Sequence, residues 1–216
     1  MRAKLLSILL LSVSLAAVGC ASPTDEDTGA ADQALTEYER VASGGKPKIE
    51  SDTTPNEATS AKTRLVGFIK DVEVEAVAAE LLHIDHWTSI KDKEGNKPFE
   101  AASLKGDSTS GDVRTVTGKV TIDGGIALDL RATSRKTEDK TSIKFANTTG
   151  YKHWLAGQIL QPGKLTIEVT LVPLRGGVIV DATMKVKLDQ MEDKAAGFCA
   201  SLPLVFDWLK GKAADS

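Results

Sequence analysis

The chain has 216 residues, of which 41% are hydrophobic, and its 27 Lys and Arg against 30 Asp and Glu give a net charge of −3. This composition supplies a packed core, so wholesale disorder is excluded, and the lack of excess positive charge argues against a nucleic-acid partner. Two cysteines are too few for a disulfide-rich scaffold or a four-cysteine zinc site.

The first 19 residues have the pattern of a secretory signal peptide. Arg2 and Lys4 form a short positive region, and an apolar run follows over 5–17. That run is about 13 residues long, whereas a helix that spans a membrane needs roughly 20. We therefore expect 1–19 to be a targeting segment that is removed from the mature protein.

The sequence Ala17-Val18-Gly19-Cys20 resembles the lipobox of bacterial lipoproteins, in which a small residue precedes a cysteine that becomes diacylated. The resemblance implies lipidation of Cys20, although the family favours Leu where this chain has Ala17. Cleavage after Ala21 is the alternative, and it would give a soluble secreted or periplasmic protein. Because no aspartate follows Cys20, the resemblance also implies anchoring at the outer membrane of a bacterial cell envelope.

Residues 20–60 have the composition of an acidic tether. They include nine acidic and three basic residues and few large apolar side chains. Such a stretch buries too little apolar surface to offset the entropy lost on ordering. We therefore expect a mostly flexible segment, in which only 34–42 is a candidate for a short helix.

The remaining residues, 61–213, have the length of one domain. A strand is predicted over 65–69. Apolar residues then recur at helical spacing over 74–82, which predicts an amphipathic helix with Asp71 as a candidate N-cap.

The middle of this domain alternates apolar and polar side chains, which is typical of an antiparallel sheet with one solvated face. The alternation is clearest over 126–133, 165–172 and 178–188, and weaker strands fit 99–104, 113–122, 142–147 and 154–160. The pairs Gly124-Gly125 and Gly176-Gly177 separate strands where hairpin turns need positive φ.

An apolar-faced helix is predicted over 191–210, near the end of the chain. Pro203 should kink or split this helix, because proline lacks a backbone donor. We expect the helix to cross the apolar face of the sheet. Cys199 lies in an apolar run and is interpreted as a small buried hydrophobic residue.

The order of these elements resembles the START-like helix-grip (SRPBCC) superfamily, which includes polyketide cyclases and lipid-transfer domains. Val72–Trp87, ending in Asp85-His86-Trp87, is similar to the first helix and the turn after it, and 157–171 is similar to the late hairpin. The resemblance implies an α+β fold in which a curved antiparallel sheet wraps around a long C-terminal helix, with an apolar cavity between them. A lipocalin-like barrel and the half-barrel of lipoprotein carriers are the alternatives.

The cavity implied by this resemblance would be lined by apolar side chains. The candidate ligand contacts are Trp87, Leu128, Leu130, Phe145, Trp154, Phe198, Leu202 and Trp208. Because ligand sites are chiefly apolar with few polar groups, these residues favour a hydrophobic small molecule or lipid as the partner. The same side chains could instead fill a closed core, which would give a structural lipoprotein.

Little in the sequence predicts catalysis. His83, Asp85 and His86 could present metal ligands or an acid/base pair at the cavity mouth, but they equally fit the polar end of a helix. No nucleophile elbow or phosphate-binding loop is recognisable. We therefore expect a non-catalytic binding protein without a metal or cofactor, with a cyclase- or hydratase-like enzyme as an alternative.

Overall fold

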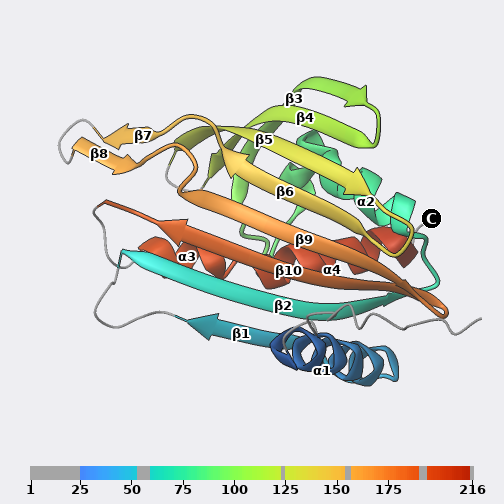
Figure 1. Ribbon diagram of the computed structural model, residues 1–216. Coiled ribbons are helices and arrows are strands. Elements are labelled where there is room, and N and C mark those ends of the chain that lie inside the picture. The colour runs from blue at the N-terminus through green and yellow to red at the C-terminus, as the bar shows by residue number, and fades with distance from the viewer. Residues whose placement is uncertain (1–24, 53–58, 123–124, 154–156, 190–193, 215–216) are drawn as a thin grey trace, which may run out of the picture.

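A computed structural model describes residues 25–52, 59–122, 125–153, 157–189 and 194–214 (Figure 1). The helices are α1 (Asp25–Ala42), α2 (Val74–Leu82), the 3-10 helix η1 (Ile84–Ser89), α3 (Lys194–Cys199) and α4 (Leu202–Ala214). The strands are β1 (Lys48–Asp52), β2 (Ser60–Lys70), β3 (Phe99–Ser110), β4 (Val113–Ile122), β5 (Ile126–Lys136), β6 (Thr141–Asn147), β7 (Tyr151–His153), β8 (Gly157–Leu160), β9 (Leu165–Leu174) and β10 (Gly177–Lys187). None of these helices is long and apolar enough to cross a membrane.

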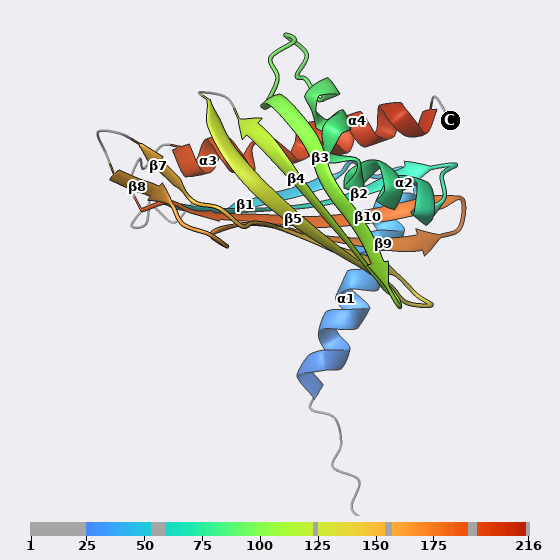
Figure 2. The same cartoon turned by 90° about the horizontal axis from the view of Figure 1, so that it is seen from above.

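One curved antiparallel sheet of eight strands organises the molecule, in the order β1-β2-β10-β9-β6-β5-β4-β3. Helices α2, α3 and α4 lie on one face of this sheet, and α1 lies on the opposite, outer face (Figure 2). The sheet is open, because β1 and β3 are edge strands. The lipocalin-like closed barrel, one of the two alternatives to the expected fold, is therefore wrong.

Alternation along the strands decides which side chains enter the core, as the sequence predicts. In β5, Leu128, Leu130 and Ala132 are buried, whereas Arg131 between them is exposed. The register places Leu130 opposite Gly118 of β4 and Asn147 of β6. The predicted strand over 113–122 is confirmed as β4, and of the predicted strand over 154–160 the described part, 157–160, is β8.

Buried Asn147 fixes the chain where it leaves and re-enters the sheet around the β7–β8 hairpin. Its Nδ2 donates to the carbonyl oxygens of Thr149 and Gln161, each at 2.8 Å, and its Oδ1 accepts from the Leu165 N–H at 2.9 Å. A buried amide with these partners avoids the cost of an unpaired polar group. The β7–β8 hairpin is thereby held at one end of the sheet, beside α3.

Two glycines let the helices approach the inner face of the sheet closely. The Phe206 ring of α4 lies against Gly67 of β2, and Ile84 of η1 lies against Gly118 of β4. The predicted C-terminal helix is split into α3 and α4 just before Pro203, which confirms the expected break. Pro203 is the second residue of α4. A backbone N–H in the first turn of a helix has no carbonyl acceptor within that helix, so proline costs no hydrogen bond there.

The prediction of a flexible tether over 20–60 is wrong for the residues that the structure describes. Helix α1 packs on the outer face of the sheet, where Val41 is buried against Val66 and Ile179. Strand β1 pairs with β2 along its whole length. Ordered structure in this acidic stretch comes from its contacts with the sheet, which its composition does not reveal.

Polar contacts also hold α1 on the sheet. Arg64 donates from Nε to Asp181 Oδ1 at 3.0 Å and from Nη2 to Asp181 Oδ2 at 2.7 Å. The same Nη2 lies 2.9 Å from Glu37 Oε2 of α1, and the Tyr38 hydroxyl donates to Asp181 at 2.9 Å. Bidentate contacts of this kind specify geometry as well as adding energy.

The start of α2 also differs from the prediction. Its N-cap residue is Glu73, which makes no side-chain capping bond, so Asp71 is not the N-cap. Asp71 instead occupies the left-handed region, with φ of 56°, and its N–H donates to the Gly176 carbonyl at 2.8 Å. The predicted signal peptide, 1–19, and the predicted lipidation site, Cys20, lie outside the described residues.

Candidate ligand-binding site

An apolar cavity of about 560 Å³ lies between the inner face of the sheet and the junction of α3 with α4. Small-molecule sites commonly measure about 300–1,000 Å³, so this volume suits a ligand. The sheet wall is built from β4, β5, β6, β9 and β10, together with Phe99 at the start of β3. The other walls are η1, the loop before β3, the β7–β8 hairpin and the α3–α4 junction, where the lining includes Phe198 and Leu204.

The aromatic side chain of Trp87 separates this cavity from the packed core under α4. Its ring centroid lies 5.2 Å from that of Phe99 and 5.3 Å from that of Phe145, at tilted angles that suit aromatic pairs. The indole Nε1 donates to the Leu81 carbonyl at 3.2 Å. Beyond this partition, a wholly apolar void of about 30 Å³ lies between α4 and the sheet. The core is therefore filled under α4 and open under the α3–α4 junction.

Polar groups in the cavity lining come mainly from the loop before β3. Asp92, Asn96 and Lys97 contribute there, whereas the opposite walls are almost entirely apolar. Asp92 accepts from the backbone N–H groups of Glu94 and Asn96 and from the Asn96 amide, each at 2.8 Å. The Asn96 bonds hold the pKa of the Asp92 carboxyl below its usual value. The lining thus has an apolar body and one polar, charged margin.

The predicted contact residues fall into different places. Trp87, Leu130, Phe145 and Phe198 line the large cavity, and Leu202 lines the small void. Leu128 is fully buried but is not part of either lining. The structure therefore gives no support for Leu128 as a ligand contact, although its strand neighbours Ile126 and Leu130 line the cavity.

The other two predicted tryptophans do not add to the described lining. Trp208 lies outside both linings, and its Nε1 donates to the Ser89 hydroxyl at 2.8 Å, which ties α4 to η1. Trp154 lies outside the described residues. Sequence reasoning missed Tyr151, Met184 and the loop residues near Asp92. Met184 had a usable signal, since it occupies an inward position of a predicted strand, and so had Leu165 and Ile167, which also line the cavity.

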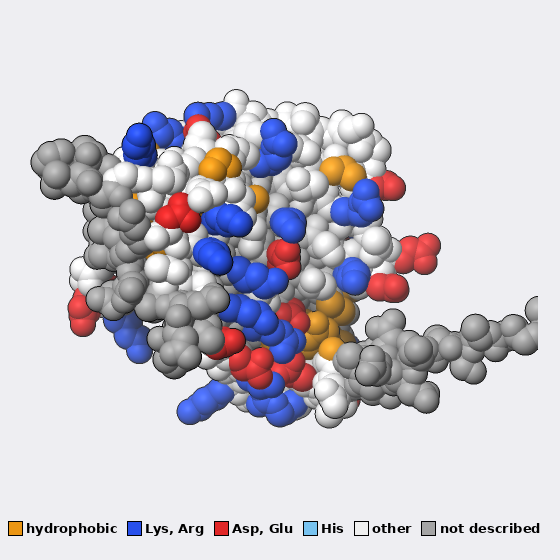
Figure 3. All heavy atoms as spheres, turned by 60° about the vertical axis from the view of Figure 1, so that its left-hand side comes forward, with side chains coloured by type: hydrophobic (Ala, Val, Ile, Leu, Met, Phe, Trp, Pro, Cys, Tyr) orange, Lys and Arg blue, Asp and Glu red, His pale blue; other side chains and the backbone are white. Residues whose placement is uncertain are grey.

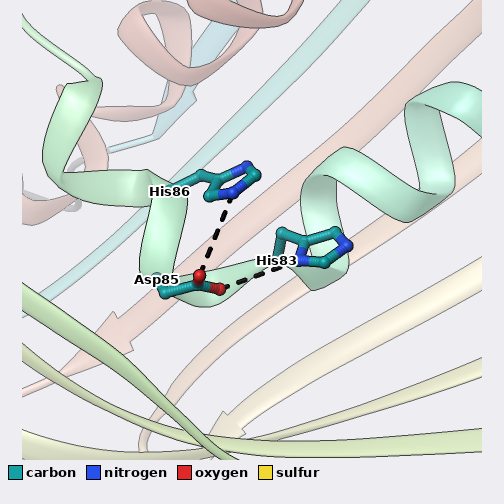
Figure 4. Close-up of side chains that lie close together, drawn as sticks. All are labelled: His83, Asp85 and His86. Atoms are coloured by element: carbon teal, nitrogen blue, oxygen red, sulfur yellow. Dashed lines mark ion pairs between the residues drawn. The ribbon is translucent and has the colours of Figure 1, made fainter.

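The polar cluster of His83, Asp85 and His86 lies apart from the cavity. These residues occupy the junction of α2 with η1, and none of them belongs to the cavity lining (Figure 4). Their side chains are between 42% and 45% exposed. The arrangement gives no support to an acid/base role for His86 or Asp85 at the cavity mouth.

Cys199 is the free cysteine of the described chain, and it is not built as a nucleophile. It is buried, and its Sγ lies 3.8 Å from the Met184 carbonyl oxygen. Burial raises the pKa of the thiol above its ordinary value, which lowers the thiolate fraction at neutral pH. The interpretation of Cys199 as a small buried hydrophobic residue is confirmed.

The outer face of the sheet has a different chemistry from the cavity. Figure 3 shows a band of lysine and arginine side chains across this side of the molecule. Lys62, Arg131, Lys144 and Lys185 are exposed there, and Lys144 pairs with Glu168 at 2.9 Å. This hydrogen bond outweighs desolvation and lowers the pKa of Glu168. The band suits hydration, so the apolar inner cavity is the better candidate for a hydrophobic ligand.

Comparison with known proteins identifies the fold. Human STARD10 matches with a TM-score of 0.50 and 11% identity, over 92% of this chain and 82% of that one. The lipid transfer and protein localization domain of human StarD13 (DLC2) matches with a TM-score of 0.50 and 9% identity, over 88% and 98%. The chain has a START-like, helix-grip fold. This confirms the α+β architecture expected from the order of the elements.

The other comparisons do not place the chain in a protein family. The di-domain ARO/CYC StfQ from the steffimycin biosynthetic pathway matches with a TM-score of 0.45 and 14% identity over 90% of this chain. The match spans about 62% of the length of StfQ. No family model matches the sequence, and no curated protein matches it.

Proposed function

We propose that this protein binds a hydrophobic small molecule or a lipid in the cavity beneath the α3–α4 junction, without a covalent step. The observation that carries the proposal is the cavity itself, about 560 Å³ of space with a predominantly apolar lining. A packed structural core would be filled at native density, as it is under α4. The StarD13 match is a lipid transfer and protein localization domain with the same fold, which agrees with this function.

The ligand that suits this lining has an apolar body and one polar end. Apolar walls from the sheet and the α3–α4 junction would remove the body of the ligand from water, which stabilises binding by about 25 cal/mol per Å² of apolar surface. The charged margin formed by Asp92, Asn96 and Lys97 offers hydrogen bonds to a polar head. A single-chain amphiphile meets both requirements.

The test is ligand capture by the purified full chain. Native mass spectrometry and lipid extraction should recover a bound amphiphile, or the delipidated protein should take up a fluorescent fatty acid. Leu130→Trp should reduce uptake at least tenfold, because the larger ring would enter the cavity. Arg131→Trp, on the outer face of the same strand, is the matched control and should leave uptake unchanged.

Two results would reject the proposal. One is a folded chain that contains no lipid and takes up no probe. The other is a Leu130→Trp variant that binds the probe as well as the original chain. Circular dichroism and a melting curve for each variant separate lost binding from lost folding.

We further propose that the protein is attached to a bacterial cell envelope, at the outer membrane, through a lipid on Cys20. The support is the sequence pattern of 1–20, a positive region and a short apolar run before Ala17-Val18-Gly19-Cys20. In bacterial cells, Cys20→Ser should move the protein from the detergent phase to the aqueous phase in a detergent partition assay. Cys199→Ser is the matched control and should not move it. Identical partitioning of the Cys20→Ser variant and the original chain would contradict the anchor.

A further inference from the structure

The junction of α2 with η1 brings three potential metal ligands together. His83 Nδ1 lies 3.8 Å from Asp85 Oδ1, and His86 Nε2 lies 3.9 Å from Asp85 Oδ2 (Figure 4). One ligand atom from each residue lies within 4.8 Å of the other two. The two imidazole rings are nearly parallel, with centroids 4.9 Å apart. The turn between the helices therefore places two imidazoles and a carboxylate on one side.

These spacings are close to those of a first-row metal site. Zinc bonds of about 2.0–2.2 Å in a tetrahedral arrangement place neighbouring ligand atoms roughly 3.4 Å apart. The two histidine–aspartate separations are slightly longer, and all three ligand atoms lie within 4.8 Å of one another, so rotation of these side chains, which are 42–45% exposed, would bring them onto one ion. The same exposure lets an ion enter and leaves the fourth position to water.

A second observation points to a metal at this cluster. His86 Nδ1 lies 3.1 Å and 3.3 Å from the two carboxylate oxygens of Glu80, which comes from α2. A proton on Nδ1 donated to Glu80 leaves Nε2, the nitrogen facing Asp85, free as a ligand. Histidines that bind zinc usually donate their other N–H to a carboxylate, which fixes the ring and raises its basicity. Glu80 is held in turn by Lys212 of α4, 4.0 Å away.

We propose that His83, Asp85 and His86 form a binding site for a divalent transition-metal ion, with zinc as the expected ion and Glu80 as the positioning residue for His86. Imidazole ligands favour zinc, copper and nickel, whereas calcium and magnesium require a shell of oxygen ligands that this cluster lacks. The site lies outside the cavity, so this inference does not rest on the proposed ligand.

A bound ion would join the end of α2 to η1. Trp87, the residue after His86, forms the partition of the cavity, so the ion would hold one wall of the cavity in place. An ion that binds only the folded chain raises the melting temperature, and the rise grows with the logarithm of the free ion concentration once that concentration exceeds the dissociation constant. At 100 times the dissociation constant, the rise expected for a chain of this size is about 5–10 °C.

The experiment uses the full chain after removal of metals with a chelator. Calorimetric titration with zinc chloride near pH 7.5 should give saturable one-to-one binding, and magnesium chloride should give none. His86→Ala and Asp85→Asn should abolish this binding. Glu80→Gln should weaken it by about 10- to 100-fold, the usual effect of losing a supporting carboxylate.

The third histidine supplies the matched control. His153 lies on β7, in the separate two-stranded sheet, and His153→Ala should bind zinc like the original chain. Without metal, the His86→Ala and Asp85→Asn variants should keep the melting temperature of the metal-free chain, because the side chains of His86 and Asp85 are 45% and 42% exposed. Absence of saturable zinc binding, or binding that survives His86→Ala, would overturn the proposal and leave only imidazole–carboxylate pairing at this junction.

Discussion

The contact between Gly67 and Phe206 gives the sharpest test of how α4 is seated on the sheet. A Cβ at position 67 would lie 2.2 Å from Phe206 Cζ and 2.4 Å from Phe206 Cε2. Carbon atoms in normal contact are about 3.5–4.0 Å apart, so Gly67→Ala must displace the ring or the helix. The adjoining void of about 30 Å³ is too small to take the ring. Overpacking of this kind costs about 1–3 kcal/mol.

Urea and thermal unfolding of the purified full chain would measure this cost. For a chain of this length, 1 kcal/mol corresponds to about 2–4 °C in melting temperature, so the expected fall is about 2–12 °C. Gly211→Ala is the matched control, because a Cβ at that position of α4 meets no atom within 4 Å. Alanine replaces a helical glycine there, and the change should stabilise the chain by up to about 1 kcal/mol.

A double variant tests the assigned cause. In Gly67→Ala combined with Phe206→Ala, the truncated side chain no longer meets the new methyl group, so the two losses should be less than additive. An unchanged melting temperature for Gly67→Ala, or fully additive losses in the double variant, would refute the assigned close approach of α4 to β2.

Three further predictions follow from burial and charge. Leu128→Asp should lower the free energy of unfolding by more than about 3 kcal/mol in urea, because an unpaired charge would enter the buried core. The control Arg131→Asp, on the exposed face of the same strand, should change it by no more than about 0.5 kcal/mol. The reverse ranking would contradict the register of β5. Cys199 should resist a thiol reagent at pH 8 until the chain unfolds, and rapid labelling of Cys199 itself in the native protein, read in the Cys20→Ser variant, would contradict its burial. Burial alone would raise the pKa of Glu37, but hydrogen bonds from Lys48 and Arg64 outweigh burial and lower it. The ionised carboxylate therefore adds stability above about pH 4.5 that is lost as the pH falls through the lowered value, and Glu37→Gln should flatten the fall in melting temperature between about pH 5 and 3.

Much of the sheet could be predicted from the sequence, because one buried face imposes a period of two. The strand over 178–188 was found in this way, and its inward residues are buried. The alternation over 178–188 places Ile179 on the solvated face, yet Ile179 is fully buried, because α1 covers it. The sequence indicated a candidate helix over 34–42, but its acidic composition carried no signal that the helix packs on the sheet. Its position depends on Arg64 and Asp181, which are distant in sequence from Glu37.

The cavity was harder to predict than the sheet. Alternation places both Leu128 and Leu130 inside, but only Leu130 borders open space. Where a core remains unfilled depends on how the helices are seated, and that depends on contacts such as Ile84 against Gly118. The polar margin near Asp92 lies in a loop without periodicity, so the sequence carried no signal for it.

Helix α1 on the outer face of the sheet affects which strands unfold locally and which unfold only with the whole molecule. Strands β2 and β10 are covered on both faces, by α1 on one side and by α3 and α4 on the other. Among the described strands, β3 pairs with β4 alone, and most of the side chains of β3 are exposed. Amide hydrogens should therefore exchange slowest in β10 and fastest along β3 and the loop before it. We therefore expect the cavity wall that includes β10 to open only when the whole fold unfolds. The wall formed by the start of β3 and the loop before it, which carries the polar margin, should open locally.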